Sequence, residues 1–165
     1  MRARWLVLLS RLLLQVAAAQ QPAADDQSMT AYCSFADENQ VSLHYSTSRR
    51  EAPQNGKVWM PGGVAPVLFV QTPLMLNNVP IPVGGYTVYV IPGKKNWTLI
   101  VSKNTTVGAK YEESQDLVRA NMDIALLPQP VETLHVSFEH SAPKRCSLRL
   151  DYGKIAAFGA DFEER

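Results

Sequence analysis

A small set of aromatic and charged side chains carries the most promising chemistry in this 165-residue sequence. Trp59 lies between two turns, and Tyr111 and Arg119 flank an acidic stretch that ends at Asp116. Aromatic rings close to an arginine can form a binding face for a sugar or a peptide. We therefore take Lys57, Trp59, Tyr111, Asp116 and Arg119 as candidate binding residues. The competing interpretation of Trp59 is that its ring closes one end of the hydrophobic core.

The sequence contains few of the residue patterns by which enzymes are recognised. There are three histidines, and His135 and His140 are five residues apart, which puts them on opposite faces of a continuous strand. A zinc site built from these two and His44 would need an unusual chain reversal. The sequence has no G-x-S-x-G turn and no phosphate-binding glycine loop, and the acidic residues between 112 and 116 are typical of a solvated loop. We therefore assign no catalytic residue and expect neither a metal nor a cofactor.

The two cysteines, Cys33 and Cys146, predict a disulfide that joins the two ends of the domain. Alternation in the first and last strands turns both thiols toward the core. An even pair of cysteines is usually bonded in an oxidising compartment. Two buried free thiols, which behave as small apolar residues, are the alternative. The pair lacks the C-x-x-C spacing of redox-active sites, so we do not expect a redox-active pair.

Residues 1–19 have the pattern of a secretory signal peptide. Arg2 and Arg4 precede a short apolar stretch, and a run of small residues provides a cleavage site after Ala19. A membrane anchor is the alternative, but the apolar stretch is short for a spanning helix and is interrupted by Arg11. We therefore expect a secreted or periplasmic protein with no stable membrane anchor after the leader is cleaved.

The charge of the chain argues against a nucleic-acid partner. The whole sequence has 16 Lys+Arg against 15 Asp+Glu and a formal net charge of +1. The leader holds three of the arginines and no acidic residue, so the mature chain carries a net charge of −2. A protein held by phosphate contacts would need a basic surface. The partner we expect instead is an unidentified ligand or protein of the cell envelope.

The elements that must position the candidate residues are strands. Residues 20–28 predict a disordered lead-in, and residues 29–165 predict a single domain with mostly period-two hydrophobicity. About eight strands without helical segments between them predict an all-β fold, namely an antiparallel β-sandwich of a jelly-roll or Ig-like variety. Segments 86–91 and 97–102 are apolar on both faces, so we place them in the middle of a sheet. Pro92-Gly93 between them predicts a type II turn.

The second half of the sequence predicts a long polar loop over residues 104–115 and three further strands. Val118–Leu126 alternates as a half-buried strand, and Pro128 and Pro130 are expected to end it. Segments 134–138 and 146–152 follow as strands. The tail after residue 153 is ambiguous, because its apolar residues have helical spacing but Gly159 weakens a helix.

Four segments resemble one known family in order and spacing, and together they span about residues 30–152. They are Gly56–Trp59, Ile81–Ile100, Tyr111–Arg119 and Pro130–Glu139. The most specific reads I-P-V-G-G-Y-T-V-Y-V-I-P-G and continues to N-W-T-L-I. The chain thus resembles DUF2911, a family of bacterial secreted proteins of unknown function. The resemblance implies an exported, β-rich domain without an established activity. One departure is Met60, where many members have arginine.

Three functional hypotheses follow from these observations. The leading one is a non-enzymatic exported β-sandwich that binds a ligand or partner in the cell envelope. The alternative is a hydrolase acting on envelope material, with Lys57, Asp116 and Arg119 arranged around Trp59. The third is a purely structural envelope component. The hypotheses differ in whether the candidate residues converge in a pocket or scatter over different faces.

Overall fold

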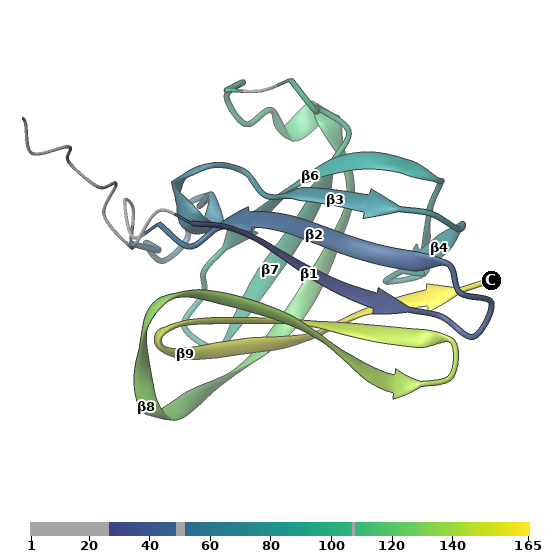
Figure 1. Cartoon of the computed structure of the whole chain (residues 1–165). Coiled ribbons are helices and arrows are strands. Elements are labelled where there is room, and N and C mark those ends of the chain that lie inside the picture. The colour runs from purple at the N-terminus through teal and green to yellow at the C-terminus, as the bar shows by residue number, and fades with distance from the viewer. Residues whose placement is uncertain (1–26, 49–51, 107) are drawn as a thin grey trace, which may run out of the picture.

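The computed structural model describes residues 27–48, 52–106 and 108–165 (Figure 1). The predicted signal peptide, and all but the last two residues of the predicted lead-in, lie outside these described residues. Within them, no helix is long and apolar enough to cross a membrane.

In the described part of the chain, nine antiparallel strands form one sheet in the order β1-β2-β3-β6-β7-β8-β9-β4-β5. This confirms the predicted all-β antiparallel fold, with one strand more than the eight or so expected. The sheet is not closed into a barrel. The strands are β1 Ser28–Ser34, β2 Gln40–Ser46, β3 Val67–Val70, β4 Leu74–Leu76, β5 Val79–Ile81, β6 Gly84–Ile91, β7 Asn96–Ser102, β8 Asp116–Ala142 and β9 Arg145–Glu164. Two 3-10 turns, η1 at Pro61–Gly63 and η2 at Glu113–Gln115, complete the described elements.

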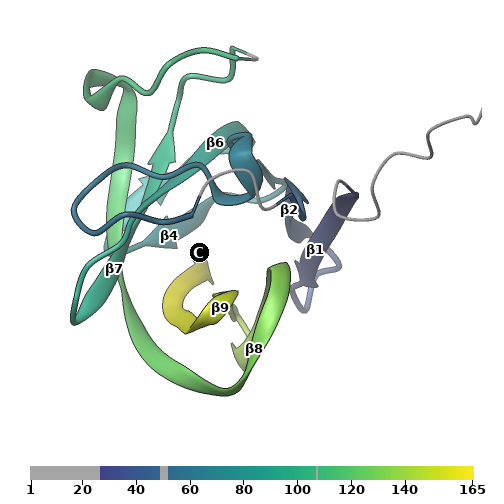
Figure 2. The same ribbon diagram turned by 90° about the vertical axis from the view of Figure 1, so that its left-hand side faces the viewer.

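The length of β8 and β9 converts this single sheet into two facing layers. The first part of β8, from Asp116 to Asp123, pairs with β7, and the part from Asp123 onward pairs with β9. Figure 2 shows β8 running down from the sheet and curving underneath it, so that the β8–β9 hairpin covers one face. Apolar side chains from both layers, such as Leu43, Leu99 and Leu148, are fully buried in one shared core. We call the outer face that face of the layer formed by β1, β2, β3, β6, β7 and the first part of β8 which points away from this core.

The prediction that β6 and β7 lie in the middle of the sheet is confirmed, since β6 is flanked by β3 and β7 by β8. Val88 and Val90 point into the shared core, so Thr87 and Tyr89 must point to the outer face. Both outward residues are nevertheless buried. The outer face is therefore covered at this point, and the covering segments are those that form the candidate site described below.

The turn predicted between β6 and β7 is wrong in its type. A type II turn needs a positive φ at its glycine, and Gly93 is not among the residues with positive φ. Glycine is required there for another reason, because a Cβ at this position would overlap the carbonyl oxygen of Asn96. Residues 92–95 form the connection.

Two expectations for the second half also need correction. Pro128 and Pro130 do not end the strand, because β8 continues to Ala142. They coincide instead with an irregularity in the pairing with β9, between Leu126 and Val131, where proline would have no N–H to donate. The ambiguous tail is strand as far as Glu164, because it pairs with β8 and then with β4.

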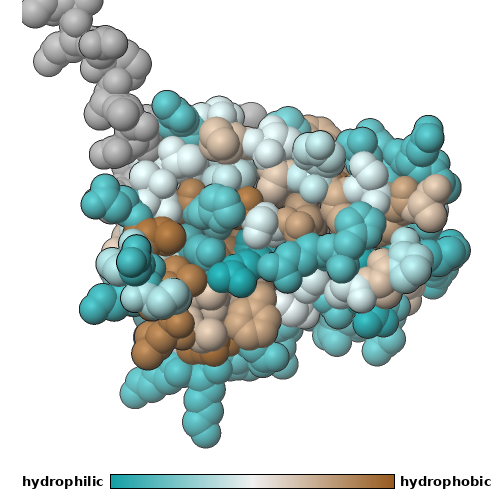
Figure 3. All heavy atoms as spheres, turned by 60° about the horizontal axis from the view of Figure 1, so that its bottom comes forward, coloured by the Kyte–Doolittle hydropathy of each residue, from teal (hydrophilic) through white to brown (hydrophobic). Residues whose placement is uncertain are grey.

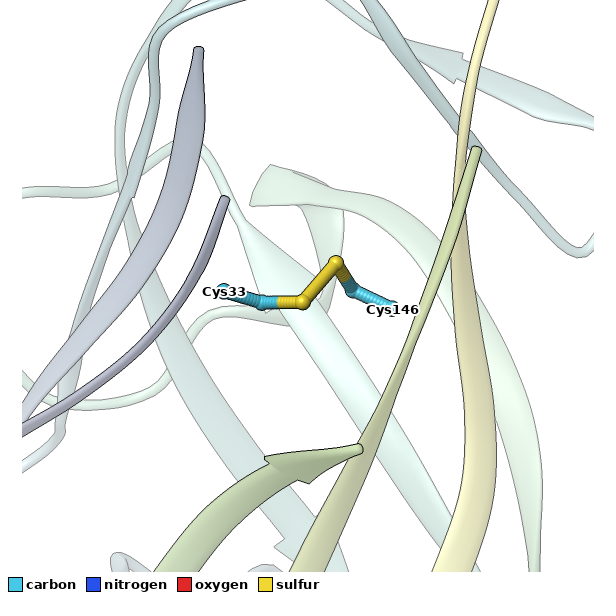
Figure 4. The surroundings of a disulfide bond; sticks show 2 residues. All are labelled: Cys33 and Cys146. Atoms are coloured by element: carbon cyan, nitrogen blue, oxygen red, sulfur yellow. A yellow bond between two sulfur atoms is a disulfide. The ribbon is translucent and has the colours of Figure 1, made fainter. Parts of the chain in front are cut away.

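The surface of the β8–β9 hairpin is mixed in polarity. Figure 3 shows this side of the molecule, where apolar side chains gather toward one end and polar ones surround them. Leu126, at 77% exposure, and Phe158 are exposed large apolar residues of the hairpin. The disulfide at the other end of this hairpin attaches it to β1 (Figure 4).

Candidate functional site

Three of the five predicted binding residues meet on the outer face in one hydrogen-bonded group. The hydroxyl of Tyr111 donates to Oδ2 of Asp116 at 2.8 Å. Arg119 donates through Nε to the same carboxylate oxygen at 2.8 Å and through Nη2 to the Tyr111 hydroxyl at 2.8 Å. Nη2 also contacts Oε1 of Glu113 at 2.9 Å. We call Tyr111, Glu113, Asp116 and Arg119 the tyrosine network.

A β-bulge explains why Asp116 and Arg119 lie on the same face although they are three residues apart. The register between β7 and β8 shifts at Val101 and Ser102, so that Ser102 pairs with Asp116 and Ile100 pairs with Arg119. Ser102 and Ile100 are two residues apart and share a face, and their partners therefore do so too. A bulge inserts one residue into a strand and redirects its side chains in this way.

The contacts within the tyrosine network shift the pKa values of Tyr111 and Arg119. Burial raises the pKa of Tyr111, and the adjacent carboxylate of Asp116 raises it further, so Tyr111 is a neutral phenol over an extended pH range. The hydrogen bond to Asp116 raises the pKa of Arg119, which keeps the guanidinium charged. These charge states match the hydrogen bonds observed, with the phenol donating to a carboxylate and accepting from a cation. The network therefore acts as a brace that holds the Tyr111 ring in place.

A pocket of about 420 Å³ lies on the outer face beside the Tyr111 ring. The rings of Tyr89 and Tyr111 meet edge to face with their centroids 5.0 Å apart. We call this cavity the outer pocket. Its walls come from the segment before β3, from the outward side chains of β3 and β6, and from the loop that joins β7 to β8. The lining residues are Val58, Met60, Gly63, Val64, Ala65, Val67, Thr87, Tyr89, Thr105, Thr106, Gly108, Ala109, Lys110 and Tyr111.

The structure does not bring Trp59 into this group. Its ring is 3% exposed and lies in the shared core, where it contacts Trp97 and Tyr152 with centroid distances of 5.8 and 5.0 Å. Backbone hydrogen bonds of 2.7 and 3.0 Å pair Trp59 with Val90 at the side of β6. Because side chains alternate along an extended segment, Val58 and Met60 point the opposite way and line the outer pocket. By packing in the core, Trp59 fixes the position of the segment whose neighbouring residues, Val58 and Met60, form the apolar wall of the outer pocket.

Lys57 is also separate from the tyrosine network. It is exposed and lies in a turn, where its own backbone N–H donates to the carbonyl of Gln54 at 3.1 Å. Sequence reasoning therefore selected Tyr111, Asp116 and Arg119, which lie together, and two residues that lie elsewhere. It missed Met60 and Tyr89, which come from distant segments. One signal for Tyr89 was available in the sequence. The segment that forms β6 is apolar on both faces, so another segment of the chain has to cover its outward side chains.

The comparisons with known proteins concern a family of unknown function. A family model described as "Protein of unknown function (DUF2911)" matches residues 36–158. The chain belongs to this family. No curated protein and no solved structure matched the chain. The range matched by DUF2911 contains the whole tyrosine network and every residue that lines the outer pocket.

The disulfide lies at the edge of the DUF2911 range. Figure 4 shows Cys33 on β1 joined to Cys146 on β9, with Cα atoms 6.2 Å apart. The predicted pairing is therefore confirmed, and both side chains point into the core, with exposures of 4% and 0%. Cys33 lies before the first residue matched by the DUF2911 model, whereas Cys146 lies within it. The crosslink thus ties the matched range to a strand that precedes it.

Proposed function

We propose that this protein is an exported binding domain that holds a small, mostly apolar molecule in the outer pocket, within the cell envelope. The observation that carries this proposal is an apolar pocket of about 420 Å³ whose aromatic wall is braced by the tyrosine network. Ligand sites in proteins are typically concave, mostly apolar cavities of roughly 300–1,000 Å³ with a few fixed polar groups. The outer pocket fits that description in size and in lining.

The lining favours a ligand with a flat apolar body and one polar end. Val58, Met60 and Val64 supply aliphatic contacts, and the edge-to-face pair Tyr89–Tyr111 supplies aromatic surface. Thr105, Thr106 and Lys110 place hydroxyl groups and one positive charge at the loop side of the same cavity. An amphipathic molecule that carries a hydroxyl or acidic group would match this distribution.

One observation and one prediction from the sequence support a location outside the cytoplasm. The disulfide between Cys33 and Cys146 is of a type that persists in oxidising compartments. The predicted signal peptide at residues 1–19 agrees with export. Mass analysis of the mature protein should find an N-terminus near Gln20, and an exported product that keeps Met1 would contradict this part of the proposal.

The hydrolase alternative required Lys57, Asp116 and Arg119 to surround Trp59. Since Trp59 lies in the core and the two charged residues of β8 lie on the outer face, no observation on the described residues favours that arrangement. The purely structural alternative predicts that the outer pocket binds nothing, so it is decided by the same experiment as the binding proposal.

The test is a fluorescence titration with N-phenyl-1-naphthylamine, an uncharged apolar probe that brightens when it leaves water. We expect saturable binding of one probe per chain. Met60→Glu places a charge in the apolar wall and should weaken binding by at least about tenfold, since an apolar probe that fills the pocket removes water from that charge without replacing its hydrogen bonds. Met29→Glu is the matched control, because Met29 is an exposed methionine on β1. Equal affinity of the two variants, or no saturable binding by the wild type, would overturn the proposal.

A further inference from the structure

Three potential metal ligands lie together at the end of the β8–β9 hairpin. The ligand atoms of Cys33, His140 and Cys146 are all within 4.8 Å of one another. They come from three different strands, β1, β8 and β9. This arrangement is unlike the three-histidine site considered from the sequence, because the cysteines supply two of the three ligands.

The sheet register explains why these side chains converge. His140 and Cys146 are direct partners in the antiparallel pairing of β8 with β9, so their side chains lie on the same face of the hairpin. That face is turned toward β1, where Cys33 lies, as Figure 4 shows for the two cysteines. The two sulfur atoms are buried, whereas His140 is exposed. The imidazole therefore stands at the rim, between solvent and the sulfurs.

We propose that reduction of the disulfide converts Cys33, Cys146 and His140 into a binding site for one Zn²⁺ ion, and that reoxidation releases the ion. Two thiolates and one imidazole are three of the four ligands of a tetrahedral zinc site, and the fourth position stays open to water or to another donor. Thiolate ligands also favour zinc over the harder cations Ca²⁺ and Mg²⁺.

The backbone geometry allows such a site without rearrangement of the strands. Two sulfurs at about 2.3 Å from a tetrahedral zinc ion stand about 3.8 Å apart. The Cα atoms of Cys33 and Cys146 are 6.2 Å apart, so rotation of the two side chains can provide this separation. The cross-strand pairing of His140 with Cys146 holds the third ligand beside them.

The chemical balance of the switch is as follows. A dithiol reductant gives two electrons and two protons to the Cys33–Cys146 bond, which becomes two thiols while the reductant becomes a disulfide. Zn²⁺ then displaces both thiol protons, and the neutral imidazole of His140 adds a lone pair. A disulfide oxidant later takes two electrons from the two thiolates and two protons from water, and so becomes a dithiol, while the Cys33–Cys146 bond forms again and the ion loses both thiolate ligands.

The experiment uses the mature protein, reduced without oxygen and freed of reductant, and titrates it with Co²⁺ as a spectroscopic substitute for Zn²⁺. We expect one Co²⁺ per chain, with thiolate-to-cobalt absorption that Zn²⁺ abolishes and that the oxidised protein never shows. His140→Ala should weaken binding by at least about tenfold, because even changes outside the ligand set cost that much at metal sites. His135→Ala is the matched control, since His135 is an exposed histidine of the same strand.

Two results would overturn the proposal. One is a reduced protein that shows no thiolate-to-cobalt absorption, and the other is a His140→Ala variant that binds Co²⁺ as tightly as His135→Ala. If the reduced chain loses its fold, Zn²⁺ must restore the near-UV circular dichroism of the wild type but not that of His140→Ala. Failure to restore it would equally overturn the proposal. None of these results depends on the ligand of the outer pocket.

Discussion

Replacing Tyr111 by phenylalanine tests the tyrosine network with the smallest possible change. The variant Tyr111→Phe keeps the ring and its contact with Tyr89, but it removes the hydroxyl group. That group makes two hydrogen bonds of 2.8 Å, one given to Asp116 and one received from Arg119. The substitution therefore removes the hydrogen bonds that hold the ring, while the ring itself still lines the outer pocket.

The expected loss of stability can be worked out from these contacts. Hydrogen bonds to charged partners contribute about 1.5–3 kcal/mol each when well formed. Two features reduce the loss here. Asp116 and Arg119 keep a direct ion pair of 2.7 Å, and the Arg119 side chain is 39% exposed, so solvent screens its charge. We expect the free energy of unfolding to fall by about 1–2 kcal/mol, which lowers Tm by about 3–8 °C.

The assay is unfolding in urea, monitored by far-UV circular dichroism. The comparison is valid if the free energy of unfolding falls with urea concentration at the same slope in each variant. Tyr32→Phe is the control, because Tyr32 is an exposed tyrosine of β1 and its substitution should change stability by less than about 0.5 kcal/mol. If Tyr111→Phe and Tyr32→Phe unfold at the same urea concentration, the network does not hold the ring and the reasoning is refuted.

Three further predictions concern the crosslink, the core and alkaline pH. Replacing both Cys33 and Cys146 by serine removes a link across 113 residues and should lower the free energy of unfolding by up to about 4–5 kcal/mol in a urea titration; a loss below about 1 kcal/mol would contradict this. Trp59→Ala should lower the free energy of unfolding by about 3–5 kcal/mol, because it removes a large side chain from the core. Lys57→Ala, in its exposed turn, should lower it by less than about 0.5 kcal/mol. Similar losses for the two variants would contradict the placement of Trp59 in the core and of Lys57 at the surface. Burial raises the pKa of Tyr111, so the folded state keeps a proton that the unfolded chain releases near pH 10. The stability that this group contributes is therefore present below about pH 10 and is lost as the pH rises further. Tyr111→Phe should therefore lose less stability than the wild type between about pH 9 and pH 11, and an equal loss would argue against the burial.

Much of the fold was predictable because strand alternation is a local property. The inward sets on β2 and on β7 follow period two, and both thiols could be turned toward the core on that basis. The course of β8 was not predictable, because prolines usually mark the end of a strand. Here Pro128 and Pro130 lie within one long strand whose pairing with β9 is irregular at that point.

The candidate site was predictable only where its residues are close in the sequence. Tyr111, Asp116 and Arg119 lie within nine positions, so a short loop and one bulge suffice to bring them together. Alternation alone could not say which face of the 57–60 segment would meet the core, so Trp59 was a candidate binding residue with closure of the core as the alternative, whereas the structure places Trp59 in the core and Met60 at the outer pocket. That choice depends on tertiary pairing with β6, which local sequence does not reveal.

The most direct test of the central claim is methyl NMR of the protein with 13C-labelled methionine, titrated with N-phenyl-1-naphthylamine. Met60 lines the outer pocket, whereas Met29 is exposed on β1 and Met122 is buried in the core. If the outer pocket is a binding site, the Met60 methyl signal should shift saturably and the signals of Met29 and Met122 should stay in place. A Met60 signal that does not move at saturating probe, or one that moves no more than that of Met29, would contradict the account.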